Sequence, residues 1–258
     1  MLKRIVFLFL LITLFCMPNV QASGLNYVAI GDSVAAGQTP SREIGAGYTD
    51  MIAMSLYRAG VIDSYSKQLS IPGYTVKQVT KKVGSAAGQR VIQNSDIMTI
   101  SAGANDLLPL FQYNSGSGTV MFNAITTALA LDGVRENYKE LLNKIYEVNP
   151  NIDVYAMGYY FPYPHVNAHY KGAVGEQLAL LNEIIKQEAE RAGAAFVPVA
   201  HYFGTDAVDY LPNPYDTHPA PAGYLAMANA FLDVYNPELP DIPDSVLGQL
   251  PEPVPFAE

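Results

Sequence analysis

Apolar residues along the chain follow two alternating patterns. Short apolar runs, which are typical of buried strands, occupy 25–30, 66–74, 96–103, 152–160 and 194–200. Between them, apolar residues recur at helical spacing over 47–60, 75–83, 121–150, 175–193 and 222–235. Thr75 is the expected N-cap of the second helix, and Gly133 is expected to break or bend the third. Strands that alternate with helices predict an α/β fold, with a mostly parallel five-stranded sheet covered by helices on both faces.

The stretch before the first strand has the pattern of an export signal. Lys3 and Arg4 precede an apolar run over 5–15, which is shorter than the roughly 20 residues of a membrane span. Small residues before Ser23 suit cleavage after Ala22, and an uncleaved N-terminal anchor is the alternative. The expected organisation is a signal peptide at 1–22, one folded domain at 23–236 and a proline-rich acidic tail at 237–258.

Composition and charge narrow the possible chemistry. The single cysteine, Cys16, falls in the expected signal, so thiol catalysis and thiolate metal sites are excluded for the exported chain. The formal net charge of −9 argues against nucleic acid as a partner, because phosphate binding needs clustered Lys and Arg. The chain of 258 residues is long enough for one sizeable core without disulfide bonds. No stable membrane span is expected once the signal is removed.

Four loops carry polar or small residues at the carboxyl ends of predicted strands or just before the last helix, where parallel sheets bind ligands. They contain Ser33, Gly73, Asn105 and, in a proline-rich segment, Asp216 with His218. Each residue taken alone has a plain structural explanation as part of a turn or a helix cap. Together they supply a hydroxyl, N–H donors for an oxyanion, and a histidine with a neighbouring carboxylate.

Asp216 and His218 are close enough in sequence to form a pair. Pro219 disfavours helical geometry at His218 and favours an extended backbone there. Residues two apart in an extended segment point to the same side, so Asp216 is expected to bond one imidazole nitrogen and leave the other free. A backbone carbonyl near Tyr215 or Asp216 is the alternative orienting group.

These four blocks, in this order, resemble the GDSL or SGNH hydrolase family. The matching stretches are GDSV at 31–34, Gly73 in IPGYT, GAND at 103–106 and DTHP at 216–219. The resemblance implies a flavodoxin-like three-layer α/β/α sandwich, with Ser33 as nucleophile, His218 as general base and Asp216 as its acid. It also implies an oxyanion hole formed by the N–H groups of Ser33 and Gly73 and the amide of Asn105.

Two positions depart from the family pattern. Val34 replaces the leucine of the family name, which is a conservative change. The family acid usually lies three residues before the histidine, where this chain has Tyr215, and Asp216 is one position closer. Asp32 is expected to fix the loop by hydrogen bonding and to take no part in the chemistry.

The resemblance implies a secreted serine esterase or lipase that hydrolyses small-molecule or lipid carboxylic esters through an acyl-serine, without a cofactor or metal. A carbohydrate O-acetylesterase and a non-catalytic cell-surface binding protein on the same fold are the alternatives. The aromatic stretch 158–170 is expected either to line an acyl pocket or to pack at the core edge. It contains His165 and His169, but no third metal ligand is evident beside them.

Overall fold

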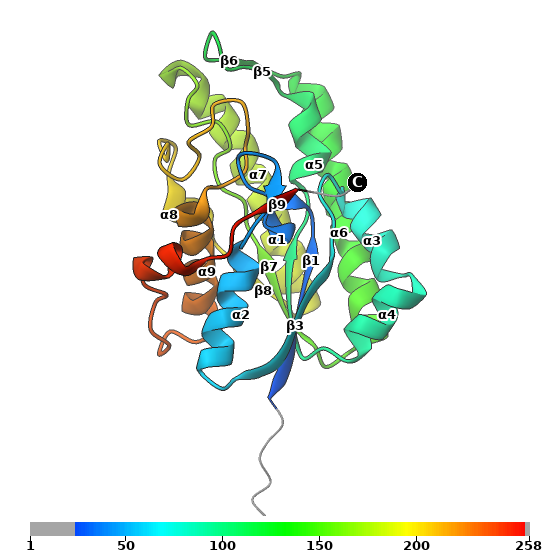
Figure 1. Ribbon diagram of the computed structural model, residues 1–258. Coiled ribbons are helices and arrows are strands. Elements are labelled where there is room, and N and C mark those ends of the chain that lie inside the picture. The colour runs from blue at the N-terminus through cyan, green and yellow to red at the C-terminus, as the bar shows by residue number, and fades with distance from the viewer. Residues whose placement is uncertain (1–23, 256–258) are drawn as a thin grey trace, which may run out of the picture.

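The protein is described by a computed structural model that covers residues 24–255 (Figure 1). The predicted signal peptide at 1–22 lies outside the described residues. The central sheet has five parallel strands in the order β3-β1-β4-β7-β8. The strands are β1 (Leu25–Gly31), β3 (Ile62–Ser70), β4 (Ile97–Ser101), β7 (Asp153–Met157) and β8 (Ala195–Val197). This order and the flanking helices confirm the predicted α/β sandwich.

Helices cover both faces of the sheet (Figure 1). One face carries α2 (Tyr48–Arg58) and α9 (Pro221–Tyr235), and the other carries α3 (Val76–Val83), α4 (Ala86–Gln93), α6 (Ala124–Val148) and α7 (Ala168–Ala192). The shorter helical segments are α1 (Ser33–Ala36), α5 (Ala104–Leu107), η1 (Leu108–Leu110), α8 (Ala200–Phe203) and η2 (Asp244–Gln249). The chain leaves β1 for β3 on one side and later extends the sheet on the other side through β4. The carboxyl ends of β1 and β4 therefore form the switch point at which such sheets bind ligands.

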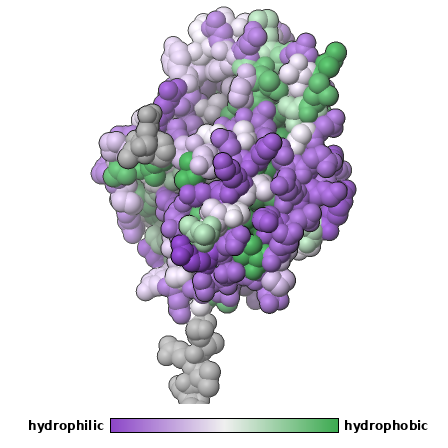
Figure 2. Space-filling view, turned by 90° about the vertical axis from the view of Figure 1, so that its right-hand side faces the viewer, coloured by the Kyte–Doolittle hydropathy of each residue, from purple (hydrophilic) through white to green (hydrophobic). Residues whose placement is uncertain are grey.

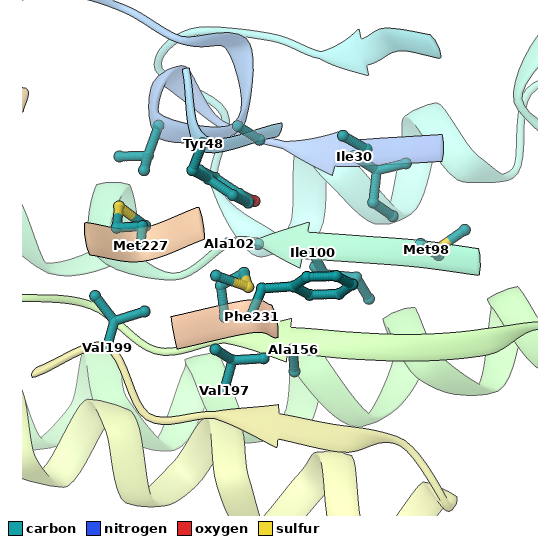
Figure 3. Packing of buried hydrophobic residues seen from close by; sticks show 14 of the residues in the cluster. Ile30, Tyr48, Met98, Ile100, Ala102, Ala156, Val197, Val199, Met227 and Phe231 are labelled. Atoms are coloured by element: carbon teal, nitrogen blue, oxygen red, sulfur yellow. The ribbon is translucent and has the colours of Figure 1, made fainter. Parts of the chain in front are cut away.

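The packing of the core explains why the strand sequences are continuous apolar runs. Ile30 in β1 and Ile100 in β4 have no exposed surface, and Phe231 of α9 packs over the sheet beside them (Figure 3). Strands covered on both faces need apolar residues on both sides. Burial of each such side chain contributes about 1.5–3 kcal/mol to folding.

The predicted break in the third long helix is wrong. α6 runs unbroken through Gly133, from its N-cap Asn123 to Val148. Leu131 and Val134 beside the glycine are buried in the core, and their packing offsets a glycine cost of about 1 kcal/mol. Met121, the first residue of the predicted segment, belongs instead to a short strand.

Two other element limits differ from the sequence pattern. α7 was expected at 175–193 but begins seven residues earlier, at Ala168, because Val174 and Leu178 pack against a second hydrophobic cluster. The second strand was expected at 66–74, but β3 begins at Ile62, which pairs with Leu25 of β1. In both cases tertiary contacts stabilise residues that carry a weak local signal.

Several elements carry too weak a pattern to be predicted. They are α4, the hairpin of β5 (Gln112–Asn114) and β6 (Thr119–Met121), and the short pair of β2 (Glu43–Ile44) with β9 (Val254–Pro255). The hairpin contributes to the second hydrophobic cluster, whose buried members are Val120, Phe161, Tyr163, Val166 and Val174.

The outer surface on the α3, α4 and α6 side is largely hydrophilic (Figure 2). Hydrophobic side chains gather at its upper end, and the large exposed ones near the hairpin and the start of α6 are Met121, Ile125 and Leu129. Between residues 24 and 255, no helix is both long and apolar enough to cross a membrane.

Candidate active site

Ser33 is held at the switch point by the backbone around it. It is the first residue of α1, directly after Gly31 and Asp32 at the end of β1. Gly31 has a φ of 139°, and a Cβ there would lie 2.0 Å from the carbonyl oxygen of Ser101 in the neighbouring strand. Only glycine fits this position, so the strand can turn tightly and present the serine.

Asp32 stabilises the same turn through hydrogen bonds to its side chain. Its carboxylate accepts hydrogen bonds from the backbone N–H of Val34 at 2.9 Å and from the hydroxyl of Tyr159 at 2.6 Å. The side chain is fully buried, and burial raises its pKa to about 6, although both hydrogen bonds oppose that shift. These bonds fix the loop, as expected from the sequence.

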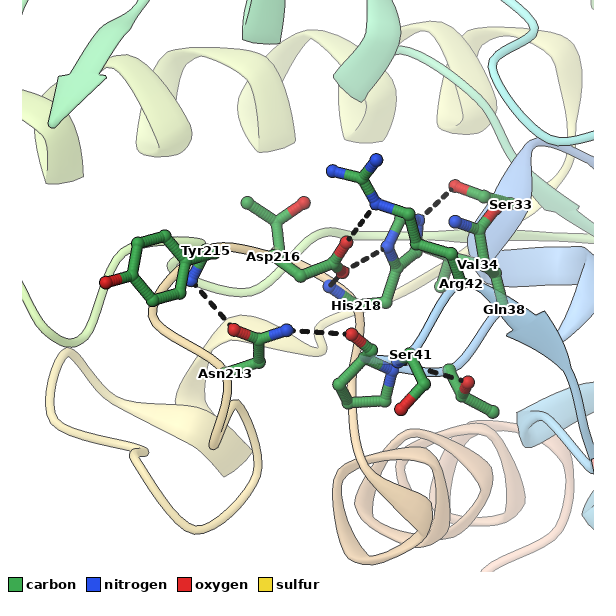
Figure 4. A network of polar contacts seen from close by, with 12 residues as sticks. Ser33, Val34, Gln38, Ser41, Arg42, Asn213, Tyr215, Asp216 and His218 are labelled. Atoms are coloured by element: carbon green, nitrogen blue, oxygen red, sulfur yellow. Dashed lines mark hydrogen bonds and ion pairs between the residues drawn. The ribbon is translucent and has the colours of Figure 1, made fainter. Parts of the chain in front are cut away.

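His218 lies between Ser33 and Asp216 (Figure 4). Its Nε2 is 2.7 Å from Ser33 Oγ, and its Nδ1 is 2.5 Å from Asp216 Oδ1. The same Asp216 oxygen also accepts the backbone N–H of His218 at 2.8 Å. The three side chains thus form a continuous chain of hydrogen bonds, although Ser33 and His218 are 185 residues apart.

The electrostatics of Asp216 determine which ring nitrogen carries the hydrogen. Burial raises its pKa, but the hydrogen bonds from His218 and the electrostatic interaction with its imidazole outweigh burial, so the pKa of Asp216 lies below its ordinary value. An ionised carboxylate only accepts hydrogen bonds, so Nδ1 of His218 donates to it. Nε2 is then left to accept the Ser33 hydroxyl proton, which is the arrangement a general base requires.

Side-chain contacts hold the loop that carries His218. Asn213 donates from its amide to the carbonyl of Pro40 at 2.8 Å and accepts the backbone N–H of Tyr215 at 2.9 Å. The Tyr160 hydroxyl donates to the carbonyl of Thr217 at 2.8 Å. Tyr215 itself is 74% exposed, and Figure 4 shows its ring directed away from the imidazole. The family's usual acid position therefore lies outside the hydrogen-bond chain.

The predicted oxyanion donors face the same pocket as Ser33. Ser33 N–H is at the start of a helix, where backbone donors lack helical partners. Gly73 has a φ of 80° after Pro72, in a turn closed by a bond from Tyr74 N–H to the Ile71 carbonyl, and a type II turn needs glycine there. The Asn105 amide donates to the Tyr74 carbonyl at 3.0 Å and retains a second N–H for a ligand.

These residues line a pocket of about 530 Å³. All five residues predicted from the sequence lie in its wall: Ser33, Gly73, Asn105, Asp216 and His218. Much of the remaining lining is apolar and comes from α5, η1, the residue directly after η1, and α7: Leu107, Leu108, Phe111, Val174, Leu178 and Leu181. The sequence interpretation missed this apolar wall. The run LLPLF directly after Asn105 and Asp106 is the signal that could have indicated it.

The aromatic stretch 158–170 is divided between the pocket and the core. Tyr159, Tyr160 and Tyr163 line the pocket, whereas Phe161 is buried in the second hydrophobic cluster. Nε2 of His165 is 2.8 Å from the Leu211 carbonyl, and His169 lies in α7. Within residues 24–255, no group of three or more His, Cys, Asp or Glu side chains could hold a metal ion.

The fold and this site define a three-layer α/β/α sandwich with a serine at the switch point of its parallel sheet. The profile of the GDSL-like lipase/acylhydrolase family matches residues 29–226. The chain belongs to this family, and its membership supports ester hydrolysis as its activity. A comparison with curated protein sequences gives no match.

Solved structures share the fold at low sequence identity. The lipase Lip_vut3 from a goat rumen metagenome superposes with a TM-score of 0.63 at 17% identity, over 80% of this chain and 95% of that one. Axe2, an acetylxylan esterase from Geobacillus stearothermophilus, gives a TM-score of 0.56 at 21% identity, over 83% and 95% of the two chains. Structures described as catalytic mutants of Axe2 carry alanine in place of a serine, a histidine or an aspartate.

Proposed function

We propose that the protein is a serine-dependent carboxylic ester hydrolase in which Ser33 is the nucleophile, His218 the general base and Asp216 the residue that orients the histidine. The observation that carries the proposal is the hydrogen-bond chain from Ser33 Oγ through His218 to Asp216 at the edge of a substrate-sized pocket. The catalytic mutants of Axe2 support the same three residue types in a protein of this fold.

The reaction proceeds in two steps. Ser33 Oγ attacks the ester carbonyl carbon while its proton passes to His218 Nε2. His218 then gives that proton to the departing alcohol oxygen as the carbon–oxygen bond breaks, leaving an acyl-serine. Water attacks the acyl-serine with His218 as base, and the acid leaves as the proton returns to Ser33 Oγ.

Negative charge develops on the carbonyl oxygen in both steps. The Ser33 and Gly73 N–H groups and the Asn105 amide are the donors proposed to stabilise it. Because they are fixed by a helix start, a turn and a side-chain hydrogen bond, they need little reorganisation. Loss of one such donor typically costs about 3–4 kcal/mol of transition-state stabilisation.

Acyl esters longer than acetate are the proposed substrates, because the apolar wall extends the pocket well beyond the space that an acetyl group needs. Carbohydrate O-acetyl esters are the second candidate, favoured by the acetylxylan esterase activity named for Axe2. Hydrolysis rates for 4-nitrophenyl esters from acetate to palmitate distinguish the two. A higher kcat/KM for octanoate than for acetate supports the first, and the reverse order supports the second.

The serine mechanism is tested by covalent labelling. A fluorophosphonate is expected to modify Ser33, with the adduct found by mass spectrometry on the peptide that contains GDSVAAGQ. Ser33→Ala is expected to lose both the label and nearly all ester hydrolysis. An adduct on another serine, together with an active Ser33→Ala enzyme, would overturn the proposed site.

The protein is also proposed to be secreted, on the basis of the pattern at 1–22. N-terminal sequencing of protein from the culture medium should begin at Ser23. A full-length chain retained in the membrane fraction would contradict cleavage after Ala22.

A further inference from the structure

Arg42 is a cationic pocket residue that the proposed mechanism leaves unused. Its side chain is 76% exposed, whereas Asp216, its partner, is 6% exposed. The contact joins Arg42 Nε to Asp216 Oδ2 at 3.4 Å, which is long for a hydrogen bond. The described residues offer no acceptor to its two terminal nitrogens, which point away from the carboxylate in Figure 4. These nitrogens leave Arg42 with donors for a ligand.

The backbone at Arg42 also indicates a use for the side chain. Its φ of 64° is the only positive value of a non-glycine residue within 24–255. A side chain in this left-handed conformation costs about 1–2 kcal/mol, a strain that glycine would avoid. The segment is fixed on both sides, since the carbonyl of Pro40 accepts from Asn213 and β2 begins at Glu43 and pairs with β9. The strained turn therefore holds the guanidinium at the pocket.

The direction of the reaction places Arg42 beside one half of the substrate. His218 Nε2 must give its proton to the alcohol oxygen, so the alcohol part of an ester leaves on the histidine side of Ser33. Figure 4 shows the Arg42 guanidinium beside the Asp216–His218 pair. The apolar residues Leu107 and Leu108, in contrast, lie two and three positions after Asn105, at the end of α5 and the start of η1. The pocket thus has a cationic alcohol side and an apolar acyl side.

We propose that Arg42 is a specificity-determining residue that binds an anionic group, a carboxylate or a phosphate, on the alcohol part of the ester. The proposal rests on the ester hydrolase function proposed above and narrows it to esters with an apolar acyl chain and a negatively charged alcohol. A guanidinium suits this role because its planar pair of N–H donors binds carboxylate and phosphate oxygens in a bidentate manner.

Two octanoate esters that differ in one charge test the proposal. They are 4-nitrophenyl octanoate and its 3-carboxy derivative, and both release a coloured phenol. The quantity compared is the ratio of kcat/KM for the anionic ester to that for the neutral ester. Arg42→Gln is expected to lower this ratio about tenfold, the size of one charge-assisted hydrogen bond. Any general loss through Asp216 affects both esters and cancels in the ratio.

Two further variants distinguish the effect of the Arg42 charge from the effect of its backbone conformation. Arg42→Lys should keep part of the preference, because it retains the charge but loses bidentate geometry. Arg42→Gly removes the strain along with the side chain, so it should fold at least as stably as the wild type and still lose the preference. Arg58→Gln, at the exposed end of α2, is the control for a change in net charge and should leave the ratio unchanged.

Binding to an inert background makes the test independent of turnover. In Ser33→Ala, calorimetry should show tighter binding of the carboxy ester than of the neutral ester, and Arg42→Gln in the same background should remove that difference. An equal ratio in wild type and Arg42→Gln, or equal binding in the two inert backgrounds, would overturn the role of Arg42. Absence of hydrolysis of either ester by the wild type, with Arg42-dependent binding retained, would count against the ester hydrolase function alone.

Discussion

The two halves of the candidate site are held in place by different means. Ser33, Gly73 and Asn105 follow strands or start helices, so the backbone of the sheet positions them. His218 and Asp216 lie in a loop without regular structure, where hydrogen bonds from other loops hold the backbone in place. We infer that changes to the backbone turn that presents Ser33 act mainly on folding, whereas changes to the side chains that orient His218 act mainly on the chemistry.

The largest expected effect falls on the loop side. Asp216→Asn should keep the fold but lower kcat about 10⁴-fold, because an amide favours the wrong imidazole tautomer. Asp209→Asn, at an exposed position earlier in the same segment, is the matched control and should have wild-type kcat. Steady-state kinetics with folding checked by circular dichroism measures both. An Asp216→Asn enzyme within a few-fold of wild type would mean that a backbone carbonyl orients His218.

A change in the backbone turn before Ser33 should lower the stability of the fold. Gly31→Ala places a Cβ 2.0 Å from the Ser101 carbonyl at a φ of 139°, so the free energy of unfolding should fall by more than about 3 kcal/mol. Gly60→Ala is the matched control, since its φ is 69° and its Cβ would meet nothing within 4 Å. That change should cost only about 1 kcal/mol for the backbone conformation. Urea unfolding of the two variants gives the comparison, and equal losses would refute the steric argument.

The two aspartates of the site should show opposite dependence of stability on pH. The pKa of Asp32 is raised to about 6, so its favourable contribution is present below pH 3.8 and is lost as the pH rises through 6. Relative to Asp32→Asn, the wild type should lose about 3 kcal/mol of unfolding free energy across that range.

The pKa of Asp216 is lowered, so its contribution is present at neutral pH and is lost on acidification. Urea unfolding from about pH 2 to 7.5 tests both signs, because the Asp216 contribution is lost only below about pH 3.8. Parallel slopes for the two Asn variants would contradict the assignment.

The difference between the two halves also explains what the sequence could predict. The positions of Ser33, Gly73 and Asn105 follow from where strands end, and a strand is a local apolar pattern. The sequence also indicated the Asp216–His218 pair, because two residues so close in an extended segment can face the same side. Arg42 and Asp216 are 174 residues apart in the sequence, so no local pattern predicts their contact.

The same reasoning applies to the fold. The parallel sheet with helices on both faces follows from alternating strands and helices, whereas the start of α7 and the continuity of α6 depend on packing. Val174 extends α7 through a contact with the second hydrophobic cluster, and Leu131 with Val134 carries α6 across Gly133. Helix propensity alone predicts a break at Gly133. The helix continues there because burial of the neighbouring side chains outweighs a local cost of about 1 kcal/mol.

The smallest expected effect concerns a single hydroxyl that holds the histidine loop. Tyr160→Phe removes the donor to the Thr217 carbonyl, next to His218, while the ring can still stack on Phe203. The loss of one buried hydrogen bond should cost about 1 kcal/mol of stability. If the whole of that 1 kcal/mol is added to the free energy of the transition state through misplacement of His218, kcat should fall by about fivefold.

Tyr138→Phe provides the matched control for this hydroxyl. Tyr138 is also fully buried, but its hydroxyl has no hydrogen-bond partner among residues 24–255. Removal of an unsatisfied buried hydroxyl should leave stability unchanged or slightly increased, with kcat unaffected. A Tyr160→Phe enzyme with wild-type kcat but reduced stability would show that the bond to Thr217 supports the fold without positioning His218. In that case Asn213 and Arg42 would remain as the side chains whose contacts can position the loop.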